Sequence, residues 1–380
     1  MNNRKSPRGW FRKLKIVLAA GVLVITGLVL FIKFDTAGAA QFTDNVLRPL
    51  LGTDAVITLE RWYYNTADKL KQLTYNSKSD TGLNFLDQSF AKDGPISSQV
   101  SLELTRLTVN PKFKPEQNEG VWNDRPLKIF PGQEVMAFTY IRPDPDRPYA
   151  YVTIIQADMK VLHLSAVAGT KQPGGPVGMS GPGVVPEQIK NSGRLVAAFD
   201  GGFQYRDGEY GMIVGNTTYL PLKPDIGTLI GYTNGDLKII KYKGQNLGPG
   251  VEFVRQNCPI LIEDGLSAVT DEKNKKLWGR TPSFDIKTWR SGIGLNKNGN
   301  VLYAVGNNLT PQTLADALLS AGAVEAIQLD INPYWVRFNI FDDTGNGTYH
   351  TSTLINKIQD GSKEYLNGYT KDFFYLYKNP

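Results

Sequence analysis

Cysteine and histidine are scarce in this chain. Its 380 residues include one cysteine, Cys258, and two histidines, His163 and His350. A single cysteine cannot form a disulfide within the chain, so the fold must depend on its hydrophobic core, which a chain of this length can supply. Because an apolar run follows Cys258 and no histidine is near it in sequence, we expect a buried structural thiol. His163 lies in an apolar segment and is expected to pack in the core.

Acidic residues are absent from the first fifteen positions, which carry six Lys or Arg. The formal net charge of +6 therefore belongs to this tail, and the rest of the chain has 36 basic and 36 acidic residues. Nucleic-acid binding requires positive charge clustered on the folded part of a protein. The neutral remainder gives no such surface, so no nucleic-acid partner is expected.

Charged residues are also absent from residues 16–32, which are apolar throughout apart from one threonine. This length is at the lower limit for a helix that crosses a bilayer. The basic tail, 1–15, predicts a cytoplasmic N-terminus and a single-pass cell-membrane protein with its domain outside. The alternative is a cleaved signal peptide, with the small residues Ala37-Gly38-Ala39 as the cleavage site and a secreted product.

The chain after the anchor divides into two parts by composition. Residues 35–120 are predicted to form a juxtamembrane region and linker, with a helix over 54–75, a strand over 100–109 and a polar loop over 110–120. Residues 121–380 are rich in short apolar runs bounded by Pro, Gly or Asp, which is typical of strands. We expect one domain there.

The pattern of this domain predicts an α+β fold, a strand-rich mixed sheet with flanking helices, preceded by the transmembrane helix. Asn234-Gly235 and Asn298-Gly299 predict hairpin turns, and Thr310-Pro311 opens a helix that Gly322 ends. The predicted helices are 186–192 and 310–321, and the predicted strands are 135–141, 150–155, 161–165, 195–199, 211–214, 228–232, 237–242, 259–262, 291–295, 301–305 and 326–330.

The first candidate site is the turn Asp200-Gly201-Gly202-Phe203, at the end of an apolar strand. Adjacent glycines let a backbone approach a ligand closely, and the strand end projects the acid. An ordinary Asp-Gly-Gly turn explains the same residues.

Two further segments carry candidate polar groups. Arg290 precedes a strand of small residues, and a guanidinium can bind phosphate or carboxylate through two hydrogen bonds. Asp330 ends another apolar strand and is followed by Asn332, Trp335 and Arg337. An acid, an amide and an aromatic ring together are typical of a sugar site. The alternatives are a salt-bridging Arg290 and a buried Asp330 that satisfies a loop.

Five motifs follow one another in a defined order. They are Asp200–Phe203, Leu261–Gly265, Arg290–Gly294 with a Lys-Asn-Gly hairpin, the helix segment Thr313–Leu318, and Leu329-Asp330. This order resembles the phosphodiester glycosidase family over roughly residues 130–345. The chain departs from the family pattern at Asp200 and Gln204, at Gly306–Asn308, and at Ile331–Tyr334, where the family has a glycine string.

The resemblance implies hydrolysis of a sugar-1-phosphodiester linkage in envelope glycans, with a carbohydrate or sugar-phosphate polymer as the partner. Asp200 and Asp330 are the implied nucleophile or base, and Arg290 is the implied phosphate ligand. The spacing of two catalytic carboxylates distinguishes retention from inversion. No certain cofactor is implied, although carboxylates at strand ends are a ligand type for Ca²⁺. The alternative is a non-catalytic glycan-binding or structural envelope protein. The candidate substrate contacts are Gly201, Gly202, Asp264, Asn332, Trp335 and Arg337.

Overall fold

The computed structural model describes residues 102–379 except 125, 126, 128, 280–286, 346, 356 and 357, together with some positions between 46 and 75. The basic tail, the predicted anchor at 16–32 and the alternative cleavage site lie outside the described residues. Within the part of the chain that is described, no helix has the length and apolar character needed to cross a bilayer. Lys69–Thr281 and Asp285–Pro380 together form one compact unit, and the elements below belong to it.

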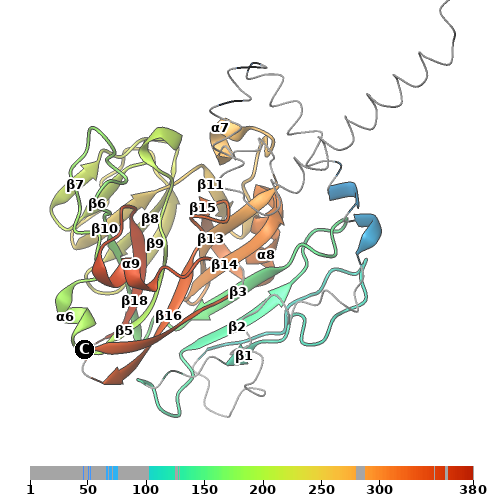
Figure 1. The fold of residues 1–380 in the computed structure, drawn as a ribbon, viewed down its shortest axis with the longest axis horizontal. Coiled ribbons are helices and arrows are strands. Elements are labelled where there is room, and N and C mark those ends of the chain that lie inside the picture. Colours follow the sequence, from blue (N-terminus) through green and yellow to red (C-terminus); the bar gives the residue numbers. More distant parts are fainter. Residues whose placement is uncertain are drawn as a thin grey trace, which may run out of the picture. The chain divides into compact units, whose positions relative to one another are not determined.

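Three antiparallel sheets build this unit (Figure 1). The largest has eight strands in the order β1-β2-β3-β14-β13-β15-β11-β12. Its strands are β1 (Asn123–Asp124), β2 (Met136–Ile141), β3 (Val152–Ala157), β11 (Ile260–Glu263), β12 (Leu266–Ser267), β13 (Thr288–Asn296), β14 (Val301–Leu309) and β15 (Ala323–Ile331).

The other two sheets have five strands each, in the orders β7-β6-β10-β8-β9 and β17-β16-β5-β18-β4. The first is formed by β6 (Met212–Val214), β7 (Thr217–Leu220), β8 (Gly227–Tyr232), β9 (Leu237–Lys241) and β10 (Val251–Gln256). The second is formed by β4 (Leu162–Val167), β5 (Leu195–Asp200), β16 (Phe338–Gly345), β17 (Thr348–Thr353) and β18 (Phe373–Lys378).

Short helices connect the strands. They are α6 (Glu187–Lys190), the 3₁₀ helix η2 (Tyr205–Asp207), α7 (Lys275–Trp278), α8 (Pro311–Ser320) and α9 (Ser362–Asn367). The α8 helix begins where Thr310 accepts a hydrogen bond from the backbone N–H of Thr313 and Pro311 occupies the first turn. Its apolar face, with Leu314 and Leu318, covers one face of the eight-stranded sheet beside Gly292 of β13.

The predicted strand-rich α+β class is confirmed, and one part of the description is corrected. The pairings between the described strands are antiparallel, so three antiparallel sheets replace the single mixed sheet that we expected. Residues 102–109 carry no strand, although the apolar run there predicted one. The β10 strand and the elements β16, β17, α9 and β18 were not predicted.

The polar stretch before β1 is attached to the eight-stranded sheet. Buried Arg142, at the end of β2, donates from Nε and Nη2 to the two carboxylate oxygens of Glu119, at 3.0 and 2.6 Å. Its Nη1 lies 3.2 Å from Glu116, whose carboxylate also accepts a 2.7 Å hydrogen bond from the Tyr151 hydroxyl. The 116–119 segment is therefore fixed by buried charge.

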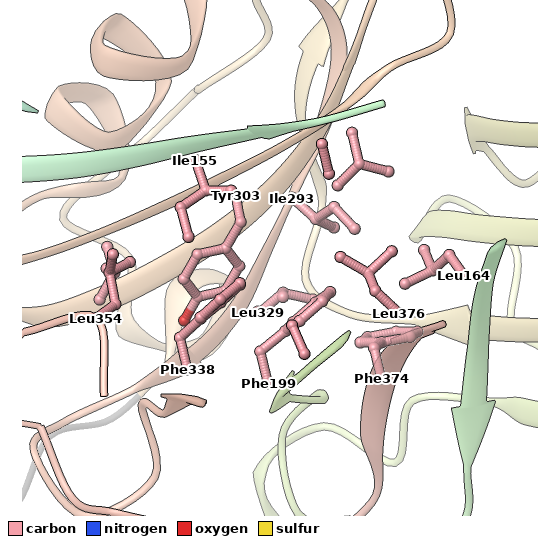
Figure 2. Close-up of a cluster of buried hydrophobic side chains, with 14 of the residues drawn as sticks. Ile155, Leu164, Phe199, Ile293, Tyr303, Leu329, Phe338, Leu354, Phe374 and Leu376 are labelled. Atoms are coloured by element: carbon pink, nitrogen blue, oxygen red, sulfur yellow. The ribbon is translucent and has the colours of Figure 1, made fainter. Parts of the chain in front are cut away.

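The largest hydrophobic cluster lies where the three sheets meet (Figure 2). Phe199 of β5 is at its centre. Its ring stacks on Phe338 at 5.4 Å and lies 5.0 Å from the Tyr303 ring and 5.6 Å from the Phe374 ring, measured between centroids. Because these rings come from β16, β14 and β18, the cluster joins two sheets directly behind the Asp200 turn.

We expect Phe199→Ala to lower the free energy of unfolding by about 3–5 kcal/mol, because it removes a ring from the centre of this cluster and leaves a cavity. Chemical unfolding of the detergent-solubilised chain measures the change. Leu266→Ala is the control, since Leu266 is 71% exposed and its truncation should change stability little. A loss below about 1 kcal/mol for Phe199→Ala would contradict the central position of this ring.

Candidate functional site

The Asp200 side chain lies at the end of β5 and is buried. Its Oδ2 accepts hydrogen bonds from the Ser291 hydroxyl at 2.5 Å and from the backbone N–H of Asp330 at 3.1 Å. Its Oδ1 accepts from the Tyr303 hydroxyl at 2.7 Å and from the backbone N–H of Arg337 at 3.0 Å. Both carboxylate oxygens are therefore occupied by two donors each.

Through these contacts the Asp200 carboxylate connects two sheets. Ser291, Tyr303 and Asp330 belong to β13, β14 and β15 of the eight-stranded sheet, whereas Asp200 and Arg337 lie in or next to the β17-β16-β5-β18-β4 sheet. Burial raises the pKa of Asp200, and the four hydrogen bonds to its charged form oppose this rise. The interpretation that fits best is a positioning carboxylate.

Asp330 is placed by a β-bulge. Leu329 and Asp330 of β15 lie opposite the single residue Ser291 of β13, because Arg290 pairs with Ile331 and Gly292 pairs with Gln328. Bulges of this kind turn side chains out of the regular alternation and are frequent beside active sites. At the bulge, the Asp330 side chain therefore does not follow the regular alternation of side chains along β15.

The Asp330 carboxylate forms a buried ion pair with Lys371, a residue that the sequence had not indicated. Asp330 is 3% exposed and Lys371 is 2% exposed. The Lys371 ammonium donates to Oδ2 of Asp330 and lies 4.7 Å from the centre of the Trp335 ring. Burial raises the pKa of Asp330 to about 7, the Lys371 charge opposes that rise, and the Asp200 charge adds to it.

The backbone before β18 holds Lys371 in this place. The N–H groups of Lys171 and Gln172 both donate to the carbonyl oxygen of Thr370, at 3.0 and 2.9 Å, and that of Thr170 donates to Tyr369 at 3.0 Å. The residues after Thr370 continue into β18, which pairs with β5 and β4. Lys371 is therefore fixed between a loop and a central strand.

A second buried ion pair explains the two glycines after Asp200. Arg255 of β10 donates from Nε to Oδ2 of Asp372 at 2.7 Å and from Nη2 to Oδ1 at 3.1 Å. The backbone N–H of Gly202 donates to the same carboxylate at 3.0 Å. A Cβ on Gly202 would lie 2.5 Å from the Arg255 guanidinium, and one on Gly201 would collide with Asp372. These glycines make room for the ion pair.

Arg290 lies on the other face of the eight-stranded sheet from Asp200. Its neighbour Ser291 contacts Asp200, and successive residues of a strand point to opposite faces. The buried Arg290 guanidinium donates to the carbonyl oxygens of Leu309 and Trp278, both at 3.0 Å, and to the amide oxygen of Gln328 at 2.6 Å. Among the described residues, no ion pair joins Arg290 to either aspartate.

Arg337 lies beside the aspartates through its backbone, and its side chain turns toward α9. The guanidinium donates to Glu364 at 3.1 Å and to Gln359 at 3.0 Å, and it covers the Tyr369 ring at 4.9 Å. Burial raises the pKa of Tyr369, and the Arg337 charge opposes this while the Asp330 charge adds to it. The Arg337 guanidinium thus contacts α9 and the Tyr369 ring.

Asn332 lies in the turn directly after Asp330, whereas Asp264 lies far from it. Asn332 has a positive φ of 69°, its N–H donates to Trp289 at 2.9 Å, and its side chain accepts from the N–H of Tyr334 at 3.1 Å. It forms the turn that presents half-buried Trp335. Asp264 is exposed in the β11–β12 turn, next to Val324 at the other end of β15 from Asp330. The structure does not bring Asp264 to the aspartates.

The structure therefore brings Asp200, Gly201, Gly202, Asp330, Asn332, Trp335 and Arg337 together, and it adds Lys371, Asp372 and Arg255. The signal for the added residues was the Lys371-Asp372 pair directly before the strongly strand-forming run Phe373–Lys378. Cys258 is buried, as expected, and burial raises its pKa to about 12. Among the described residues, no group of three or more His, Cys, Asp or Glu side chains is arranged to hold a metal ion.

Comparison with known proteins agrees with the motifs. Residues 193–330 match the family model of the phosphodiester glycosidases, so the predicted resemblance is confirmed over this segment. No curated protein matches the chain.

Three solved structures show weak similarity. The zebrafish N-acetylglucosamine-1-phosphodiester alpha-N-acetylglucosaminidase catalytic domain, auto-inhibited by its pro-peptide, has a TM-score of 0.38 and 12% identity over 68% of this chain and 88% of its own. A hypothetical protein from Synechocystis has a TM-score of 0.33 and 13% identity, over 60% of this chain and 59% of its own. A putative exported protein from Burkholderia pseudomallei has a TM-score of 0.29 and 10% identity, over 61% and 74%.

We expect Asp372→Asn to destabilise the protein by about 3–5 kcal/mol, because it leaves the Arg255 guanidinium buried without its counter-charge. Thermal or urea unfolding measures this. The matched control is Glu103→Gln, which removes the acid of the exposed pair Lys297–Glu103 and should have little effect. Equal stability of both variants would show that the buried pair does not support the Asp200 turn.

Proposed function

We propose that this chain is a hydrolase that cleaves a sugar-1-phosphodiester bond, with Asp330 as the carboxylate that acts on the sugar. The observation that carries the proposal is the buried Asp330–Lys371 ion pair in contact with the Trp335 ring. Asp330 is also the last residue of the segment that matches the phosphodiester glycosidases. The family match and the local geometry support the same reaction class.

The sugar side of the reaction requires negative charge and an apolar face. Positive charge develops on the sugar carbon as the phosphate leaves, and a carboxylate stabilises it, attacks it, or activates a water molecule. Asp330 has the carboxylate for this task. Trp335 is half-buried beside it and offers an indole face on which a sugar ring can stack.

The phosphate side requires a cation, because negative charge grows on the leaving oxygen. The Lys371 ammonium, next to Asp330 and Trp335, meets this need better than Arg290. To bind phosphate, Arg290 must give up carbonyl oxygens that it holds on the other face of the sheet. The proposal therefore moves the phosphate role from Arg290 to Lys371.

Asp200 supports Asp330 and does not act on the substrate in this proposal. Its two oxygens already accept four hydrogen bonds, one of them from the backbone N–H of Asp330. A carboxylate so occupied is a poor nucleophile but a good anchor for the strand end. Asp330 alone then serves as nucleophile or base.

The second candidate function is glycan binding without hydrolysis. The observation that favours it is that the segment after Asp330, Ile331–Tyr334, replaces the glycine string of the family with larger side chains. Larger side chains at these positions can keep a phosphodiester away from Asp330 while Trp335 still binds a sugar. The outcome of the hydrolysis assay below distinguishes the two functions.

The proposed location is the outer face of the cell membrane, with residues 16–32 as the anchor and an envelope glycan as the substrate. We expect protease to digest the domain in intact cells stripped of their outer layers, because a basic tail retained inside leaves the domain outside. Immunoblotting of the domain measures this. Protection of the domain, or a mature N-terminus near Gln41, would contradict the anchor.

We expect the full-length chain in detergent to hydrolyse the α-linked sugar phosphate bond of UDP-N-acetylglucosamine, with water as the second reactant and N-acetylglucosamine and UDP as products. Asp330→Asn should lower kcat/KM by roughly 10²–10⁴-fold, because the amide conserves size but removes the charge. The control is Asp236→Asn, in the exposed β8–β9 turn, which should keep wild-type activity. The free energy of unfolding of each variant should equal that of the wild type, so that a change in rate does not reflect a loss of folded protein. Near-full activity of Asp330→Asn would make Asp330 a structural acid, and binding without turnover by the wild type would favour the glycan-binding function.

A further inference from the structure

Lys371 contacts both groups on which the proposed reaction depends. Its ammonium donates to Oδ2 of Asp330 and lies 4.7 Å from the Trp335 ring centre. The other Asp330 oxygen, Oδ1, accepts only a 3.2 Å hydrogen bond from the N–H of Ile331 among its described contacts. A buried carboxylate with so few donors depends strongly on its counter-ion.

The other surroundings of Asp330 disfavour its ionised form. The carboxylates of Asp200 and Asp372 both repel it, and burial removes it from water. The charge of Asp330 also acts on Tyr369 and Cys258, and burial raises both pKa values far above neutral, so these groups stay uncharged. Of the groups that favour the ionised form of Asp330, Lys371 has the largest effect on its pKa.

We propose that Lys371, besides its role toward the phosphate, keeps the Asp330 carboxylate ionised through their ion pair, beside the indole of Trp335 on which a sugar can stack. This inference rests on the proposed function of Asp330 as a nucleophile or base. It goes beyond that function because it assigns the control of the charge of the acid to a residue 41 positions away.

Two substitutions of Lys371 distinguish an electrostatic role of its charge from a role of its side chain in packing. The backbone on both sides of Lys371 is held by the loop contacts of Thr370 and by β18, and its ammonium donates to Asp330. Lys371→Met keeps the length of the stem and removes the charge. Lys371→Arg keeps the charge and is the matched control. A packing role predicts that Met is tolerated better than Arg, whereas the proposed role predicts the reverse.

The test is the dependence of kcat/KM on pH for the full-length chain in detergent. Since the ionised carboxylate is the active form, wild-type kcat/KM should rise with pH and level off above the pKa of Asp330, about 7. Lys371→Met should move this midpoint upward by about 1–3 pH units, the usual effect of losing an opposite charge at contact distance. Lys371→Arg should leave the midpoint near that of wild type.

A second measurement follows the protonation of Asp330 without relying on catalysis. Infrared difference spectra follow the protonated carboxyl band that Asp330→Asn lacks, and its midpoint should shift upward in Lys371→Met by the same amount as the rate profile. Trp335 fluorescence, obtained by subtracting Trp335→Phe, should change at the wild-type midpoint, because loss of the carboxylate charge frees the ammonium over the ring.

The outcomes are distinct. An unshifted infrared midpoint in folded Lys371→Met overturns the inference. If Lys371→Met does not fold, the fluorescence step in the wild type decides, and its absence at the Asp330 midpoint overturns the inference. A shifted infrared midpoint in a protein that hydrolyses no sugar phosphodiester sustains the Lys371–Asp330 coupling while the proposed function fails.

Discussion

Four hydrogen bonds to one buried carboxylate hold the candidate site together. Asp200 accepts from Ser291, Tyr303 and the backbone of Asp330 on one sheet, and from the backbone of Arg337 beside another. A buried ion of this kind is stabilising only if all its lone pairs are satisfied, so each partner is placed by the same requirement. The end of β15 and the start of β16 are therefore fixed relative to β5, and Asp330 and Trp335 with them.

Two buried ion pairs lie close to this arrangement in the chain's contacts, through Gly202 and through Asp330. Arg255 and Asp372 have several partners and close contacts with the backbone around Gly202, which is the pattern of a structural pair. Asp330 and Lys371 have fewer partners, and the lysine lies against a half-buried ring. Since the adjacent residues Lys371 and Asp372 supply one member of each pair, the two positions before β18 link the Arg255 pair to the Asp330 pair.

The sequence predicted the acids at the strand ends but not their partners. Asp200 and Asp330 each follow an apolar strand, and the pattern that places a polar group at a strand end is local. Lys371 contacts Asp330 across 41 positions, and Asp372 contacts Arg255 across 117. Such contacts depend on the pairing of β18 with β5, for which local periodicity carries no information. The sequence also predicted Arg290 beside the aspartates. A shift of one position along β13 decides which face of the sheet a side chain reaches, and the local pattern does not specify that position.

The segment after Asp330 departs from the family pattern and forms a turn without a glycine. A glycine string supplies positive φ values, and Asn332 adopts φ 69° in its place, as asparagine can at low cost. Its side chain then accepts from Tyr334, and its carbonyl oxygen accepts from Trp335 at 3.4 Å, which closes the turn. Glycines at these positions would form the same turn without side chains. The substitution thus places an indole face over Lys371, where apolar surface and positive charge meet, and a sugar phosphate combines the complementary features.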